Sequence, residues 1–146
     1  MNNADGLEPR EEQLQFLEEE LSEPGTCRLP FWHTSRYSAV PDGDEPFVDP
    51  FWDALRGHTE IVVSANEHNM QRFEPIDGIT QFVSGAGGHG LYFLDSEDPR
   101  LAFGDDETYG ALRLELEPGL ARYSFVASDG EVLDEGEIPC EPLGAP

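Results

Sequence analysis

The amino-acid sequence predicts an α/β fold with a mixed sheet, flanking helices and a C-terminal antiparallel meander. Three features lead to this prediction: a helical apolar stripe near the N-terminus, short β-branched runs in the middle, and alternating apolar residues after Tyr109. The 146 residues suit one domain, and nine Phe, four Tyr and two Trp can fill its core. We expect an acidic tail over residues 1–10, the domain over 11–140, and a second tail over 141–146.

Two helices are expected in the first half of the chain. Apolar residues recur at three-to-four spacing over residues 14–21, behind an acidic first turn, which is typical of an amphipathic helix. A Pro-Gly pair at 24–25 should end this helix. A shorter helix should begin at Pro50, bury one aromatic face, and stop at Gly57.

Three short apolar runs predict the strands of the mixed sheet. Residues 60–64 and 79–84 are typical of buried strands, and residues 26–33 are read as a third, interrupted by Pro30. Residues 65–74 are polar and follow one of these strands. Because an α/β sheet presents its active-site loops at strand carboxyl ends, we expect any chemistry there.

The C-terminal part of the chain is predicted to form the meander. Leucines alternate over residues 112–116, aromatic residues alternate over 123–125, and a final strand is expected over 132–138. The Asp129-Gly130 pair between the last two runs is a strong hairpin signal. We therefore expect three consecutive antiparallel strands.

The charge balance excludes some classes of partner. The chain has 31 Asp and Glu against eight Arg and no Lys, a net charge of -23. Nucleic acids and anionic membranes both require basic patches, so we expect neither as a partner. No apolar run is long enough to span a bilayer, and the first ten residues lack the pattern of a secretory signal. These features predict a cytoplasmic protein.

The two cysteines, Cys27 and Cys140, fit no metal-binding pair spacing. A disulfide between them would close a loop of more than a hundred residues and stabilise the fold by roughly 4–5 kcal/mol in the chain-entropy model. Two buried free thiols are the alternative, and the sequence leaves both open.

Two further motifs are interpreted as structural. Residues 85–90 carry the letters of the dinucleotide fingerprint, but strand-like residues follow and no β-α-β unit continues, so we expect a tight turn. The acidic cluster at 105–107 does not match the spacing of a calcium-binding EF-hand loop. A solvated loop is the expected structure there.

Two histidines, His33 and His68, lie where ligands are expected, at the ends of predicted strands. The segment around each resembles the calcineurin-like metallophosphoesterases, in particular the bacterial members of the purple acid phosphatase type. Residues 31–38, FWHTSRYS, resemble that family's YWHHPRFS segment. Residues 63–73, VSANEHNMQRF, resemble its LSGHDHNYERF segment.

Other segments resemble the same family in the same order. Residues 13–17, QLQFL, resemble its QLAWL helix, and residues 81–88, QFVSGAGG, resemble its QFVVGTGG strand and loop. The resemblance extends over residues 11–140. It implies that the fold is the C-terminal half of the metallophosphoesterase β-sandwich.

The resemblance implies metal ligands at particular positions. His33 and His68 each match one histidine ligand, and Asn66 replaces the first histidine of the family's His-x-His pair. An amide offers only a neutral carbonyl oxygen where the family has an imidazole nitrogen. The remaining residues of this motif loop are Ala65, Glu67, Asn69 and Arg72.

The family's Asp-x-His, Gly-Asp and Gly-Asn-His motifs, which supply its bridging aspartate and further ligands, have no counterpart in this sequence. Isolated imidazoles do not retain a metal pair. The resemblance therefore implies a truncated and degenerate phosphoric ester hydrolase that is inactive alone and has no cofactor when isolated. It implies a pair of Fe, Zn or Mn ions only where a partner completes the site.

Two alternatives remain: a phosphoesterase completed in trans by an N-terminal half, and a non-catalytic protein-binding module. In the complete family a second half covers the sheet, so an apolar face should be open here. We expect either an N-terminal half-domain as partner or self-association. Members of the family are often exported, so the resemblance implies export as an alternative to a cytoplasmic location.

Overall fold

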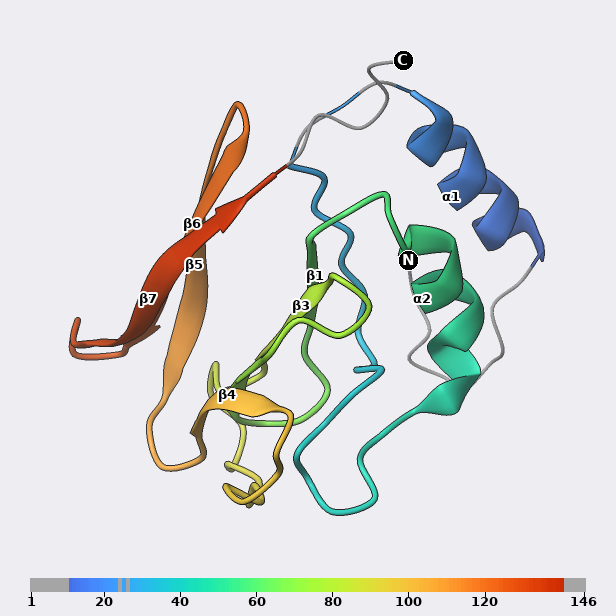
Figure 1. Ribbon diagram of the computed structural model, residues 1–146. Coiled ribbons are helices and arrows are strands. Elements are labelled where there is room, and N and C mark those ends of the chain that lie inside the picture. The colour runs from blue at the N-terminus through green and yellow to red at the C-terminus, as the bar shows by residue number, and fades with distance from the viewer. Residues whose placement is uncertain (1–10, 24, 26, 141–146) are drawn as a thin grey trace.

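The computed structural model describes residues 11–23, 25 and 27–140. Its elements are α1 (Glu11–Ser22), the 3-10 helix η1 (Pro46–Val48), α2 (Asp49–Leu55), β1 (Ile61–Ser64), β2 (Met70–Phe73), β3 (Thr80–Ser84), β4 (Leu101–Asp105), β5 (Gly110–Glu117), β6 (Leu120–Ala127) and β7 (Val132–Pro139). The first four strands form a mixed sheet in the order β1-β3-β2-β4, and the last three form the sheet β5-β6-β7 (Figure 1). The predicted α/β fold class, with its meander, is confirmed. The predicted tails at 1–10 and 141–146 lie outside the described residues.

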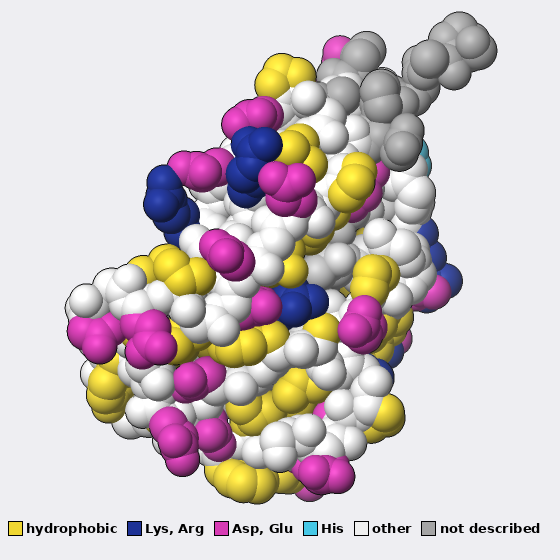
Figure 2. All heavy atoms as spheres, turned by 60° about the vertical axis from the view of Figure 1, so that its left-hand side comes forward, with side chains coloured by type: hydrophobic (Ala, Val, Ile, Leu, Met, Phe, Trp, Pro, Cys, Tyr) yellow, Lys and Arg dark blue, Asp and Glu magenta, His cyan; other side chains and the backbone are white. Residues whose placement is uncertain are grey.

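The meander packs against one face of the mixed sheet. Phe125 and Ala121 of β6 are fully buried in one cluster with Ile61, Met70 and Phe82 of the mixed sheet. Alternation along β6 turns these side chains inward, as the sequence predicts. The side of the molecule that comes forward in Figure 2 shows acidic side chains spread among apolar ones, with few arginines.

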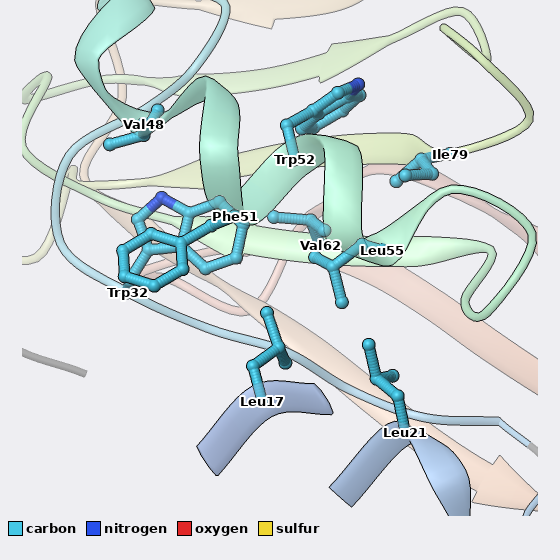
Figure 3. Close-up of a cluster of buried hydrophobic side chains, with 9 residues drawn as sticks. All are labelled: Leu17, Leu21, Trp32, Val48, Phe51, Trp52, Leu55, Val62 and Ile79. Atoms are coloured by element: carbon cyan, nitrogen blue, oxygen red, sulfur yellow. The ribbon is translucent and has the colours of Figure 1, made fainter. Parts of the chain in front are cut away.

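The two helices cover the other face of the mixed sheet. Leu17 and Leu21 of α1 are buried, as predicted from their spacing. In α2 a proline in the first turn starts the helix, and Gly57 follows its end with a φ of 71°, which a glycine adopts without strain. Figure 3 shows how both helices contribute to one cluster: Leu17, Leu21, Trp32, Val48, Phe51, Trp52, Leu55, Val62 and Ile79.

An ion pair connects the two sheets. The guanidinium of Arg72, on β2, donates two hydrogen bonds to the carboxylate of Asp134, on β7, at 2.7 and 3.0 Å. Both side chains are mostly buried, and the guanidinium carbon also lies 5.2 Å from the centre of the Tyr123 ring. Hydrogen bonding to Asp134 raises the pKa of Arg72, so the guanidinium stays protonated at every pH at which the protein is studied.

A disulfide joins the start of the domain to its end. Cys27 and Cys140 are bonded, with their Cα atoms 4.9 Å apart, and the bridge spans 113 positions of sequence. Of the two alternatives that the sequence leaves open, the structure contains the disulfide. The bridge ties the end of β7 to the segment before β1.

Two sequence predictions about the mixed sheet need correction, and one of its strands was not predicted. In the described part of residues 26–33 the structure has no strand, only one parallel bridge between Phe31 and Val63. Pro30 interrupts the ladder because it has no N–H to donate. The polar loop predicted over residues 65–74 is shorter, since β2 begins at Met70. Strand β4, which pairs with β2, was not predicted.

Candidate functional site

An open hollow of about 450 Å³ lies at the carboxyl ends of β1 and β3. These two strands are parallel neighbours, so their carboxyl ends lie at one edge of the sheet. The hollow is lined by His33, Ala65, Asn66, His68, Ser84, Gly85, Gly87, Gly88 and His89. It therefore brings together both histidines at which the resemblance implies ligands, and the asparagine between them in sequence.

The first histidine is positioned by the backbone beside β1. The carbonyl of His33 accepts a hydrogen bond from the Ala65 N–H at 3.0 Å, which aligns it with the residue that follows β1. The His33 side chain is exposed. It is therefore free to contact solvent or another molecule.

The second histidine is held by the loop that follows β3. Nδ1 of His68 donates to the carbonyl of Gly90 at 3.1 Å, and the Tyr92 ring stacks on His68 with centres 4.1 Å apart. The Tyr92 N–H donates to the His68 carbonyl at 3.0 Å. With its proton on Nδ1, the ring has an unshared electron pair on Nε2.

A glycine allows the two loops of the site to approach each other. A Cβ at Gly85 would lie 1.9 Å from the backbone oxygen of Glu67, so no other residue fits there without moving the loop. The Gly85 N–H also donates to the Asn69 carbonyl at 3.0 Å. Residues 85–90 are therefore a close turn, as the sequence analysis predicts.

Asn66 and Glu67 lie next to one another but differ in exposure. Asn66 has a φ of 42°, a conformation that asparagine adopts more readily than most residues. Its amide donates to a Glu67 oxygen at 3.3 Å, and the Ser35 hydroxyl donates to the other at 3.4 Å. Glu67 is 4% exposed and does not line the hollow, and burial raises its pKa despite these hydrogen bonds.

The two remaining polar residues of the motif have structural partners. Asn69 is fully buried; its amide donates to the Tyr92 carbonyl at 3.1 Å, and its oxygen accepts from Gln71 at 2.8 Å. Arg72 lies on β2, outside the loop, and binds Asp134 on the other sheet. These residues hold the loop and the two sheets in place.

The structure adds one residue that the sequence analysis does not assign to the site. His89, in the glycine-rich turn, has its ring centre 4.3 Å from that of His68. Three of the four histidines of the chain thus line one hollow. The only signal in the sequence is a histidine among glycines, and its proximity to His68 depends on how two loops fold.

The residues present do not fit the metal pair that the resemblance implies. Within residues 11–23, 25 and 27–140, no group of three or more His, Cys, Asp or Glu side chains could hold a metal ion. Besides His33 and His68, the hollow contains the amide of Asn66. The carboxylate nearest to these residues in sequence, that of Glu67, is buried and does not line the hollow. A metal pair requires carboxylates that this hollow does not contain.

No protein-family model and no curated protein matches the sequence. Among solved structures, GAP50, the anchor in the inner membrane complex of Plasmodium, matches with a TM-score of 0.75 and 16% identity, over 90% of this chain and 43% of GAP50. PhoD matches with a TM-score of 0.62 and 12% identity, over 94% of this chain and 35% of PhoD. The chain has a metallophosphoesterase-like fold.

These identities are low, so the likeness concerns the fold. The chain spans less than half the length of either structure. The predicted resemblance is confirmed at that level, as the architecture of part of a larger fold. None of the helices described here is long and apolar enough to cross a membrane.

Proposed function

We propose that residues 11–140 form the C-terminal half of a metallophosphoesterase-type hydrolase and do not hydrolyse phosphate esters on their own. The observation that carries this proposal is the donor set of the hollow. It has imidazoles and one amide, and the described residues offer no cluster of three ionisable metal ligands. Hydrolysis by two metals depends on ligands that hold both ions about 3.5–4 Å apart.

Electrostatics support the same conclusion. The net charge of -23 gives the molecule a field that repels phosphate esters. In a complete site, bound cations would offset this repulsion. Because the described residues within 11–140 offer no ligand set for these cations, they lack both a means of activating water and an affinity for a phosphate ester.

An open apolar groove supports the proposal that another half covers this region. The groove, of about 420 Å³, lies between α1 and the segment that runs beside β1. Phe16 is 54% exposed and Phe31 is 68% exposed at its walls. Exposed aromatic patches of this kind mark interaction sites. The missing ligands would come with the covering half, from elsewhere in a longer polypeptide or from a separate chain.

Metal content and turnover together test the proposal. The 146-residue chain is incubated with Mn²⁺, Zn²⁺ or Fe³⁺, desalted, and assayed for bound metal and for hydrolysis of p-nitrophenyl phosphate. We expect fewer than two ions per chain and the same background rate as a His33→Ala/His68→Ala variant. Two tightly bound ions, with turnover that the double variant abolishes, would refute it.

Completion in trans is the second candidate, favoured by the same groove. It predicts that phosphatase activity appears when the chain is mixed with a polypeptide carrying the Asp-x-His, Gly-Asp and Gly-Asn-His motifs. A Phe31→Glu variant places a charge in the groove and should prevent activation, whereas His58→Ala, outside the groove, should not. Activity that is unchanged by Phe31→Glu would count against this surface as the interface.

A non-catalytic binding module is the remaining alternative. GAP50, which has the same fold, is an anchor in a membrane complex of Plasmodium, so a protein of this architecture can serve in assembly. If the motif loop makes such contacts, an Asn66→Ala/His68→Ala variant should lose a partner that the wild-type chain retains in a pull-down. Equal recovery of that partner would exclude the loop.

We also propose that the chain resides in an oxidising compartment, in agreement with the family's frequent export. A disulfide such as Cys27–Cys140 persists in such compartments and is reduced in most cytosols. Alkylation with a maleimide-polyethylene glycol reagent immediately after cell lysis tests this. Two modified cysteines per chain would indicate a reducing location.

A further inference from the structure

We infer that the extended segment around Phe31 pairs with a β-strand of a partner polypeptide, and that this strand alternates apolar and basic residues. The segment lies beyond β1, at the opposite edge of the mixed sheet from β4. The inference rests on the proposed function for the existence of a covering half. It goes further by stating how that half attaches and which side chains it must present.

The extended segment pairs with β1 on one side only. The Trp32 N–H donates to the Val63 carbonyl at 3.2 Å, and the Val63 N–H donates to the Pro30 carbonyl at 3.1 Å. Because the backbone groups of successive residues in an extended chain point to opposite sides, those of Leu29 and Phe31 point away from β1. In the described part of the chain, no group bonds to the backbone of either residue. The sheet therefore ends in an open edge, which is a template for pairing with another chain.

This edge lacks the usual protection against pairing. Proteins protect edge strands with charged side chains, or with a proline that removes an outward donor. Pro30 faces β1 through its carbonyl, so its missing N–H lies on the paired side. The outward-facing residues Leu29 and Phe31 are apolar, and Phe31 is 68% exposed. The edge is therefore able to accept a strand.

The groove beside the edge explains the apolar half of the expected pattern. Its walls are α1, with Phe16 and Leu17, and the segment that ends at Phe31. Side chains of a strand alternate between its two faces, so every second residue of an added strand would face this groove. In complexes formed by strand addition, main-chain hydrogen bonds supply affinity and pockets for alternate side chains supply specificity. We therefore expect apolar residues at alternate positions.

Charge around the groove explains the basic half of the pattern. Helix α1 carries five glutamates and no basic residue. Glu12, Glu19 and Glu20 are exposed and lie three or four positions from Phe16, which places them on its face of the helix. Arg28 lines the groove, but its guanidinium donates to backbone carbonyls at the end of α1. Lys or Arg side chains of an added strand would therefore meet carboxylates.

The same charge argues against a second copy of the chain as the occupant. Two molecules that each carry a net charge of -23 repel one another, and the repulsion is strongest at low salt. A strand with lysines or arginines lowers this electrostatic cost instead of doubling it. The occupant that fits both the edge and the charge is a basic strand from a different polypeptide segment.

Peptide binding to the full chain tests the inference. The probe is a short fluorescent peptide in which lysine and valine alternate, and its affinity is measured by anisotropy in about 0.15 M salt. Phe31→Ala should weaken binding at least about tenfold, because a central aromatic side chain dominates such interfaces. Phe93→Ala is the matched control, since Phe93 is 70% exposed and does not line the groove. Equal affinities of the two variants would overturn the inference, as would equal binding of a peptide with glutamate in place of lysine.

Hydrogen exchange, followed by nuclear magnetic resonance, detects the main-chain pairing directly. The Phe31 amide should exchange at least about tenfold more slowly when the peptide is bound. A peptide held by charge alone would leave that rate unchanged, and this result would overturn the inference. So would a dimer of the chain alone, seen by analytical ultracentrifugation, in which the Phe31 amide is already protected. Neither measurement reads metal content or turnover, so the failure of the strand addition and the failure of the proposed function are distinguishable.

Discussion

A methyl group added at Gly85 should distort the motif loop, and the structure allows the cost to be worked out. The new Cβ would lie 1.9 Å from the Glu67 oxygen and 2.8 Å from the Glu67 carbonyl carbon, both of them backbone atoms. Relief requires a backbone shift of about 1 Å or more. Inserting an extra methyl group into a well-packed site costs about 1–3 kcal/mol of stability. The contacted atoms here belong to the Glu67 backbone, which cannot rotate away, so we expect a cost at the upper end of this range. Loss of the Gly85–Asn69 hydrogen bond adds about 1 kcal/mol.

We therefore expect Gly85→Ala to lower the free energy of unfolding by about 3–4 kcal/mol in a urea titration. Gly87→Ala is the matched control, because a Cβ there meets nothing within 4 Å and its φ is not in the left-handed region. That variant should lie within about 0.5 kcal/mol of wild type or be slightly stabilised, since alanine reduces the entropy of the unfolded chain. Equal stabilities of the two variants would refute the close approach of the loops.

Three further predictions concern stability. Arg72→Met should lower the free energy of unfolding in urea by about 2 kcal/mol, a value between those for exposed and buried ion pairs. Adding Asp134→Leu should restore part of this stability, because no unpaired buried charge then remains. Two strictly additive losses would contradict the pairing. Because burial raises the pKa of Glu67 in the folded state, its contribution is present at low pH and is lost as the pH rises through that pKa. Glu67→Gln should thus gain stability relative to wild type between pH 4 and pH 7 in thermal melts, and a constant difference would show that the carboxyl does not titrate abnormally. Reduction of Cys27–Cys140 should cost roughly 4–5 kcal/mol of unfolding free energy in the chain-entropy model, so a midpoint unaffected by dithiothreitol would exclude a stabilising bridge.

The parts of the fold that the sequence predicts are those with local signals. The spacing of Leu17 and Leu21 indicates α1, and the alternation around Phe125 indicates β6, because each pattern depends on only a few neighbouring residues. Strand β2 is not predicted by such local patterns. Its Gln71 and Arg72 are polar, and they are buried only because Asn69, Ala39 and Asp134 provide partners, two of them distant in sequence.

The same distinction applies to the candidate site. The sequence predicts His33 and His68 at one edge of the sheet because each follows an apolar run read as a strand. Residues 27–33 form no strand, but the parallel bridge between Phe31 and Val63 keeps His33 beside the end of β1. The contact between His68 and His89 depends on two loops, and no short pattern encodes it. Arg72 is expected in the loop because it lies in the segment that resembles the family's motif, although it stands on β2 and binds Asp134 on the other sheet.

The backbone of the motif loop and its metal chemistry have separate requirements. The loop keeps its shape through the close approach at Gly85, the buried amide of Asn69 and the left-handed conformation of Asn66. None of these contacts involves a metal ligand. An asparagine satisfies the backbone at position 66, yet it supplies no imidazole. The architecture of the loop therefore does not depend on an imidazole at position 66, which is why a metallophosphoesterase-like fold in this chain does not by itself imply hydrolysis.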